Sequence, residues 1–231
     1  MSTFAQKVIQ FNRQLSFTGK LPKEITILNP FKENKEILPA SEIFYNQFFD
    51  DNRRRRLILG INPGRFGAGT TGIPFTDTKH FFEACGIKIQ SVTTHEPSSV
   101  FIYEMIEKYG GVKKFYGDFY LNAVCTLGFV RLNEKGHWVN YNYYDSDELF
   151  SAMKEFIVSG IRRQITFGTD TSTCFALGKK NAKYLEQLNK EEKFFDSIVA
   201  LEHPRYIMQY KAKSKGKYIV EYINKFTSYK A

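Results

Sequence analysis

Four short runs of β-branched and aromatic residues, separated by stretches with helical spacing, constrain the fold most. The runs are Arg56–Asn62, Phe119–Thr126, Arg163–Thr169 and Ser197–His203. Each is nearly continuous in its apolar character rather than alternating, which is typical of strands covered on both faces. Strands that alternate with helices indicate parallel pairing through right-handed crossovers. We therefore predict a three-layer α/β/α sandwich with a central, mainly parallel four-stranded sheet.

Amphipathic stretches between and around these runs supply the helices of the sandwich. The predicted helices are Thr3–Leu15, Ser41–Phe49, Thr78–Cys85, Val100–Tyr109, Ser146–Ser159, Thr171–Leu188 and Tyr218–Phe226. Asp77 is expected to cap the helix that begins at Thr78. The chain has no internal repeat and no clear boundary. We therefore expect one domain over residues 1–231, with residues 1–50 as an N-terminal helical extension packed on it.

Composition narrows the class of protein. The 231 residues carry 33 Lys and Arg against 24 Asp and Glu, a formal charge of +9 that favours a polyanionic partner such as nucleic acid. No apolar run approaches the ~18 residues that span a bilayer, so we expect no membrane partner. The first residues lack an apolar signal core, which predicts a cytoplasmic (nucleoid) or nuclear protein that is not secreted. The run Arg53–Arg56 reads as surface charge or general attraction to DNA.

The cysteines and histidines show no metal-binding pattern. Cys85, Cys125 and Cys174 are widely spaced and odd in number, so we expect buried thiols in a reducing compartment. His80, His95 and His137 have no partner pattern, and the sequence contains no H-E-x-x-H or Walker motif. We expect neither a metal nor a cofactor.

The segment from Gly60 to Thr76 contains five glycines and two prolines directly after a predicted strand. Glycines at this position let backbone amides approach a ligand closely. Gly67, Gly69 and Gly72 formally match the G-x-G-x-x-G dinucleotide fingerprint. The match is discounted because Pro74 follows the third glycine, where the fingerprint requires a helix to continue.

The string G-I-N-P-G-R-F-G-A-G-T-T-G-I-P-F, Gly60–Phe75, resembles the first active-site motif of the single-strand-selective monofunctional uracil-DNA glycosylases. The dipeptide His203-Pro204 after the last predicted strand resembles their second motif. The resemblance extends over roughly Arg56 to Phe226 and is strongest in the first motif. It implies a uracil-DNA glycosylase fold and an enzyme of base-excision repair that removes uracil, or 5-substituted uracils, from single- or double-stranded DNA.

The resemblance also implies roles for individual residues. Asn62 matches the residue that positions the attacking water, and His203 matches the donor to the uracil O2. Phe75 matches the aromatic ring on which the extruded base stacks, and Asn122 matches the asparagine that reads the base edge. The same loop places Gly64, Phe66 and Ala68 at the base. Each residue also has a structural interpretation: a turn cap for Asn62, a structural histidine, core packing for Phe75, or an asparagine satisfied by backbone.

Arg65 in the first motif and several residues after the histidine are candidates for contact with DNA. The candidates are Arg65, Arg205, Tyr206, Ile207, Met208, Lys211, Lys213 and Lys215. The run Tyr206–Met208 suits either a wedge that fills the vacated base stack or the first turn of a buried helix. The lysines suit either a phosphate-contact patch or a solvated face.

Four positions depart from the family pattern. Arg65 and Ala68 replace a proline and a methionine in the first motif, and the second motif reads H-P-R-Y rather than H-P-S-P. A smaller Ala68 leaves room near C5 of the base. The sequence thus predicts a monomeric, monofunctional glycosylase. The alternatives are a non-catalytic nucleic-acid-binding module with a retained base pocket and a different small-ligand enzyme on the same scaffold.

Overall fold

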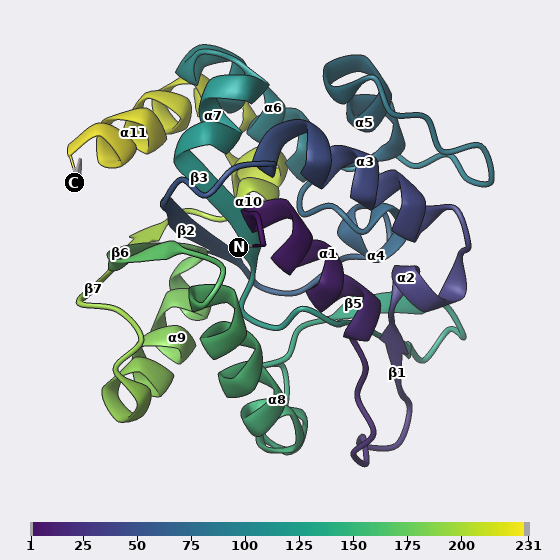
Figure 1. The fold of residues 1–231 in the computed structure, drawn as a ribbon. Helices are drawn as coiled ribbons and strands as arrows, with labels where there is room; N and C mark the ends of the chain where they lie inside the picture. The colour runs from purple at the N-terminus through teal and green to yellow at the C-terminus, as the bar shows by residue number, and fades with distance from the viewer. Residues whose placement is uncertain (1, 229–231) are drawn as a thin grey trace.

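The centre of the molecule is a four-stranded parallel sheet, seen in a computed structural model that describes residues 2–228 (Figure 1). The strand order is β3 (Phe119–Ala123), β2 (Arg55–Gly60), β6 (Thr169–Leu177) and β7 (Ser197–Leu201). All three neighbouring pairs are parallel. The carboxyl ends of these strands therefore meet at one edge of the sheet, where ligands bind in open α/β folds.

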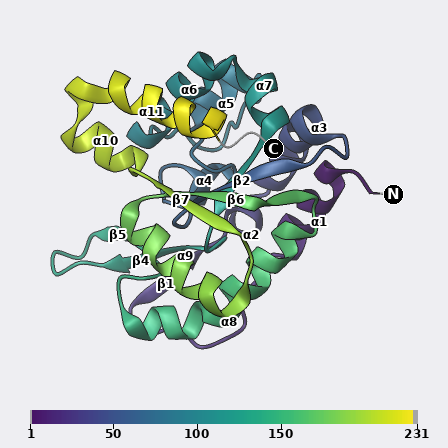
Figure 2. The same ribbon diagram turned by 90° about the vertical axis from the view of Figure 1, so that its left-hand side faces the viewer.

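Helices cover both faces of this sheet (Figure 2). One layer contains α6 (Pro97–Tyr109), α7 (Val112–Asp118) and α11 (Lys215–Ser228), and the other contains α8 (Asp147–Ile165) and α9 (Lys179–Glu192). Phe226 of α11 packs on Phe119 and Phe175 of the sheet, with ring centroids 4.7 and 4.9 Å apart. This arrangement confirms the predicted three-layer sandwich. Shorter helices are α2 (Pro30–Glu33), α4 (Ala68–Thr71), α5 (Thr78–Cys85), α10 (Pro204–Tyr210) and the 3₁₀ turn η1 (Ala212–Ser214).

The N-terminal segment packs beside the sheet near β3. It contains α1 (Phe4–Gln14), which Thr3 and Gln6 cap reciprocally, and α3 (Ile37–Phe49). The ring of Phe4 lies edge-on to Tyr120 of β3, with centroids 5.1 Å apart. The C-terminal part of α1 reaches the site described below, where Phe11 and Asn12 line a cavity.

Arg55 corrects the expectation that Arg53–Arg56 is surface charge. Its side chain is fully buried and pairs with Asp51, with Nη1 2.7 Å from Oδ1. The guanidinium also lies over the rings of Phe4 and Phe49. The hydrogen bonds from Arg55 and Arg53 outweigh burial and hold the pKa of Asp51 well below its usual value. Arg55 therefore fastens the N-terminal segment to the sheet rather than attracting DNA.

One predicted strand is wrong. Residues Arg163–Ile165 end helix α8, and the third strand of the sheet is Thr169–Leu177, part of which was predicted as the start of a helix. The first half of β6 is polar and irregular, because its pairing with β2 jumps from Asp170 to Cys174. This bulge removes the apolar pattern by which a buried strand is identified.

A second, antiparallel sheet was not predicted. It consists of β1 (Ile25–Leu28), β4 (Gly128–Leu132) and β5 (Trp138–Tyr141), with β4 in the middle. The strands β4 and β5 form a hairpin whose turn is held by Asn133, which accepts hydrogen bonds from the backbone of Lys135 and His137. Short strands of mixed polarity give little periodic signal, which is why the sequence did not reveal this sheet.

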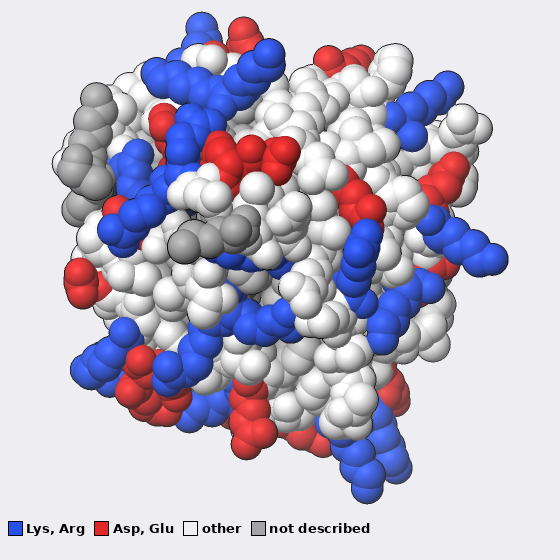
Figure 3. All heavy atoms as spheres, in the orientation of Figure 1, with Lys and Arg blue, Asp and Glu red and all other residues white. Residues whose placement is uncertain are grey.

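The remaining expectations concern cysteines, membrane spans and charge. Cys85, Cys125 and Cys174 are free and buried, as predicted. Among residues 2–228, no helix is long and apolar enough to cross a membrane. Lys and Arg are interspersed with Asp and Glu on the face in Figure 3. The excess positive charge therefore does not form a single patch there.

Candidate active site

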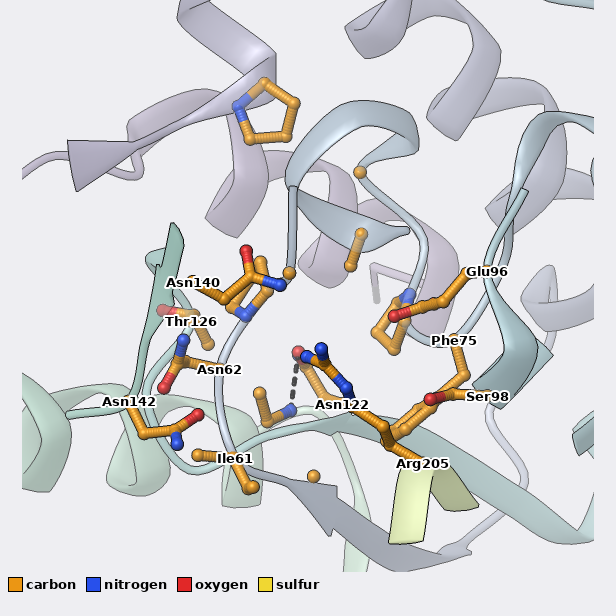
Figure 4. A pocket seen from close by; sticks show the side chains of 18 of the residues that line it. Ile61, Asn62, Phe75, Glu96, Ser98, Asn122, Thr126, Asn140, Asn142 and Arg205 are labelled. Carbon is orange, nitrogen blue, oxygen red and sulfur yellow. Dashed lines mark hydrogen bonds between the residues drawn. The ribbon is translucent and has the colours of Figure 1, made fainter. Parts of the chain in front are cut away.

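A cavity of about 320 Å³ lies at the carboxyl edge of the parallel sheet. It brings together residues from the loop after β2, the end of β3 and the start of α10, as well as from α1 and β5. Eight of the predicted site residues line it: Asn62, Gly64, Ala68, Phe75, Asn122, His203, Arg205 and Tyr206. Figure 4 shows several of these side chains converging on the cavity.

Asn62 is fixed by two backbone contacts. Its Nδ2 donates to the carbonyl of Tyr141 at 3.2 Å, and its Oδ1 accepts from the amide nitrogen of Tyr143 at 3.0 Å. One partner can only accept and the other can only donate, so the orientation of the carboxamide is determined. The side chain keeps one N–H and one oxygen lone pair for a further partner. The role of a turn cap therefore accounts for only part of the hydrogen-bonding capacity of Asn62.

Thr126 lies on the same side of the cavity as Asn62 (Figure 4). It is 8% exposed, and its Oγ1 is a buried atom without a hydrogen-bond partner. A buried hydroxyl of this kind is costly unless a ligand or water satisfies it. Two polar groups with free capacity therefore face one end of the cavity, which suits a held water molecule.

Asn122 lies at the carboxyl end of β3 and is almost completely buried. Its Oδ1 accepts from the backbone N–H of Ala123 at 2.9 Å, a bond drawn in Figure 4, and its Nδ2 donates to the hydroxyl of Tyr120 at 2.6 Å. These contacts use one N–H and one oxygen lone pair of the amide. The contact with Ala123 agrees in part with the interpretation of Asn122 as an asparagine satisfied by backbone. The other N–H and the other lone pair remain, side by side, for a ligand.

His203 is the N-cap of α10, and its Nδ1 accepts from the backbone N–H of Arg205 at 3.1 Å. Burial, together with the positive charge of Arg205, lowers the pKa of the imidazole from 6.5 to about 4. The ring is therefore neutral at pH 7, with its proton on Nε2. A neutral ring of this tautomer can donate one hydrogen bond into the cavity.

Phe75 has its ring 5.7 Å from that of His203, at an interplanar angle of 49°. Its backbone is in the left-handed region, with φ at 53°. A phenylalanine in that conformation is strained by about 1 kcal/mol or more, and such strain gathers at ligand sites. Gly60 completes the fit, because a Cβ there would lie 2.7 Å from the Phe75 ring. The loop thus holds an aromatic face against the cavity.

Glu96 lies across the cavity from Asn62 and Thr126, beside Ser98 at the start of α6 (Figure 4). Burial raises the pKa of its carboxyl to about 7, the charge of Asp77 adds to the increase, and Arg205 opposes it. A Cβ on Gly67 would lie 2.1 Å from Oε2 of Glu96, so a larger residue at position 67 would displace this carboxyl from its present position. No sequence pattern pointed to Glu96.

Asn181 of α9 joins the strand ends beneath the cavity. It is fully buried, and its Nδ2 lies within 3.3 Å of the carbonyls of Leu59, Gly60 and Leu177. Its Oδ1 accepts from the hydroxyl of Tyr143 at 3.0 Å. Since Tyr143 also donates its N–H to Asn62, this network connects the sheet to the candidate catalytic amide.

Comparison with known proteins agrees with this geometry. A sequence model described as "Uracil DNA glycosylase superfamily" matches residues 47–227. The chain belongs to the uracil DNA glycosylase superfamily. Among solved structures, "The crystal structure of WT Pedobacter heparinus SMUG2" is 54% identical, with a TM-score of 0.96, over 99% of this chain and 98% of that one. These matches confirm the family resemblance and the fold, whereas no curated protein matches.

Several residues predicted from the glycosylase motifs lie outside the cavity. Phe66 is 48% exposed and Arg65 turns away toward Trp138, so neither lines the cavity. Ile207 is fully buried, which corrects its assignment as a DNA wedge and supports the buried-helix alternative. Met208 also packs against the core.

The predicted lysines divide into two kinds. Lys211 and Lys213 are exposed, whereas Lys215 pairs with Glu104, with Nζ 2.6 Å from Oε1. The first two are therefore available for phosphate contact, and the third is partly occupied. Among the described residues there is no group of three or more His, Cys, Asp or Glu side chains that could hold a metal ion.

The cavity is also lined by polar residues that the sequence did not indicate: Asn12, Glu96, Ser98, Thr126, Asn140 and Asn142. Thr126 follows a predicted strand at its carboxyl end, so the rule for open α/β sheets could have identified it. The others come from elements whose position depends on the unpredicted hairpin and on the docking of α1.

Proposed function

We propose that this superfamily member is a monofunctional DNA glycosylase that extrudes uracil from DNA and hydrolyses its N-glycosidic bond. The observation that carries the proposal is the convergence of Asn62 and His203, 141 positions apart, on one cavity that Asn122 also lines. Removal of uracil in this way would begin base-excision repair. The flipped base, the water and the departing negative charge each need a place in such a cavity.

Base recognition would rest on Asn122 and Phe75. The free N–H and lone pair of Asn122 can donate to O4 and accept from N3–H of uracil, whereas cytosine presents the reverse pattern. The ring of Phe75 offers a face on which the extruded base stacks. The backbone and Tyr120 already orient Asn122, so its carboxamide loses no further conformational entropy when a base binds.

Charge stabilisation would rest on His203. As the glycosidic bond breaks, the sugar becomes oxocarbenium-like and the base acquires negative charge at O2. The neutral imidazole donates from Nε2 to that oxygen, and the Arg205 amide keeps the tautomer. The start of α6 at the cavity adds the partial positive charge of a helix N-terminus.

The attacking water would be held by Asn62 and Thr126. An amide does not accept a proton near pH 7, so Asn62 orients the water rather than acting as a base. The unpartnered hydroxyl of Thr126 supplies a second contact. Of the described residues that line the cavity, none is a lysine, which favours hydrolysis by water over attack by an amine.

Ala68 lines the cavity together with Phe31, Tyr45 and Asn12. A larger side chain at position 68 would take up part of this space. We therefore include 5-substituted uracils among the substrates.

The DNA itself would approach α10. Arg205 and Tyr206 line the cavity and are exposed. Lys211 and Lys213, which follow directly after α10, are exposed as well. These groups provide phosphate contacts and an aromatic edge near the opening.

The test is incubation with single- and double-stranded oligonucleotides that contain one uracil, followed by alkali. Strand scission at the uracil position is expected. Tight DNA binding without abasic product would instead support the alternative, a nucleic-acid-binding module that has lost turnover. Absence of both would point to a different ligand on this scaffold.

A further inference from the structure

We propose that Trp138, Leu132 and Phe66, together with Arg65, form a stacking platform for the single-stranded DNA that flanks the nucleotide in the cavity. This aromatic platform rests on the proposed function for its substrate and adds an interaction surface to it. All three apolar side chains are unusually exposed, at 45%, 45% and 48%. The platform lies on the β4–β5 hairpin and the glycine-rich loop, away from the α10 contacts described above.

The hairpin register places Trp138 next to the cavity. Trp138 pairs with Leu132, and Asn140 pairs with Val130, so these four residues share one face of the hairpin. Asn140 lines the cavity. Trp138 precedes Asn140 by two residues on the same strand, at a distance of about 7 Å. The exposed indole is therefore continuous with the cavity wall.

Arg65 joins the loop to the hairpin at two points. Its amide nitrogen donates to Oδ1 of Asn140 at 3.0 Å, and its Nη1 donates to the carbonyl of Trp138. The guanidinium lies 4.4 Å from the centroid of the Phe66 ring. Arg65 thus holds Phe66 and Trp138 on neighbouring elements and presents a positive charge between them. This explains why Arg65 and Phe66 turn away from the base pocket.

Single-stranded DNA matches this platform better than duplex DNA does. Exposed aromatic rings next to a guanidinium stack unpaired bases, at a contribution that corresponds to about 5- to 100-fold in affinity per base. Paired bases in a duplex offer no free faces to such rings. Lys135 in the hairpin turn adds positive charge beside the acidic Glu134, whereas Arg131 lies on the other face of the hairpin, over the ring of Tyr141. The hairpin and α10 project on the same side of the molecule (Figure 2). A strand can therefore cross the cavity from one to the other.

The experiment uses the protein's own fluorescence. Trp138 is the single tryptophan in the sequence, so its emission reports directly on a base stacked against it. Uracil-free oligothymidylate is titrated into the full chain, and saturable quenching is expected. Affinity is measured separately with a fluorescein-labelled oligonucleotide. We expect Trp138→Ala to weaken this affinity 5- to 100-fold and Trp138→Phe to restore most of it.

Controls separate the platform from general effects. Phe82 of α5 is 56% exposed and does not line the cavity, so Phe82→Ala should leave affinity unchanged. Duplex DNA should quench little. Equal quenching by duplex, or wild-type affinity in both Trp138→Ala and Phe66→Ala, would overturn the platform. Quenching by oligothymidylate without any uracil release would preserve the platform and reject the proposed enzymatic function.

Discussion

The backbone N–H of Arg205 donates to Nδ1 of His203 across 3.1 Å, at the first turn of α10. This contact leaves the proton of the neutral imidazole on Nε2, the nitrogen that can serve a ligand. The pKa of about 4 keeps the ring neutral through the physiological range. In the proposed reaction, His203 is therefore a hydrogen-bond donor of fixed direction rather than a general acid.

Thr126→Val tests whether the unpartnered hydroxyl holds the water. The substitution removes a buried polar atom without changing shape, so we expect the free energy of unfolding to rise by about 1 kcal/mol, or a Tm increase of roughly 2–4 °C. The value of kcat for uracil release should fall about tenfold with KM unchanged.

Thr169 provides the matched control for that variant. Its Oγ1 is likewise buried and unpartnered, but it begins β6, at the opposite edge of the sheet. Thr169→Val should stabilise the protein to a similar extent with kcat unaltered. Equal kcat in the two variants would remove Thr126 from the mechanism.

Asn122→Asp tests base recognition. A carboxylate only accepts hydrogen bonds, so it loses the donor to O4 and places negative charge beside the departing base. We expect uracil release to fall at least about 100-fold, with selectivity shifting toward cytosine, whose amino group donates. Single-turnover assays on oligonucleotides with one uracil or one cytosine measure both rates. Unchanged discrimination would show that Asn122 does not read the base.

Ala68→Met tests the space beside Ala68 in the cavity. Ala68 lines the cavity, and a longer side chain would take up part of the region that Phe31 and Tyr45 also line. We expect kcat/KM for 5-hydroxymethyluracil to fall by about tenfold or more relative to kcat/KM for uracil. A parallel loss for both bases would mean that the substituent does not enter this region.

Glu96→Gln tests the titration of the cavity wall. Burial raises the pKa of Glu96 from 4.5 to about 7, so the folded protein holds this proton where the unfolded chain has released it. The resulting stability is present below pH 4.5 and is lost as the pH rises through 7. Glutamine has no proton to lose. We therefore expect the free energy of unfolding of Glu96→Gln, relative to that of wild type, to rise between pH 5 and pH 8 by on the order of 1–3 kcal/mol, as measured by denaturant unfolding. A constant difference across that range would contradict the raised pKa.

The sequence predicted the fold where local patterns were strong. The strands β2 and β3 contain the apolar runs Leu57–Leu59 and Phe119–Leu121, and Asp77 caps α5 with its Oδ1 2.9 Å from the amide nitrogen of His80, as expected. The sequence-based prediction failed where tertiary contacts, rather than the local apolar pattern, determine the structure. The bulge in β6 depends on its pairing with β2, and the burial of Arg55 depends on Phe4 and the carbonyl of Tyr116, all far away along the chain.

The candidate site shows the same difference between residues marked by local sequence patterns and residues placed by tertiary contacts. Asn62, Asn122 and His203 stand at strand ends, where both the family motifs and the rule for open sheets direct attention. Glu96 and Asn140 reach the cavity from elements placed only by packing, and no local signal marks them. The outward turn of Phe66 depends on Arg65 binding a hairpin that the sequence did not reveal.

The most direct test of the account compares uracil release and DNA binding in Asn62→Ala and His203→Ala. Single-turnover rate constants are measured on a uracil-containing single strand, and affinity is measured on the same strand without uracil. The convergence of these residues on one cavity predicts that each rate falls about 100- to 1,000-fold while affinity stays within a few-fold of wild type. Release at the wild-type rate in either variant would contradict it.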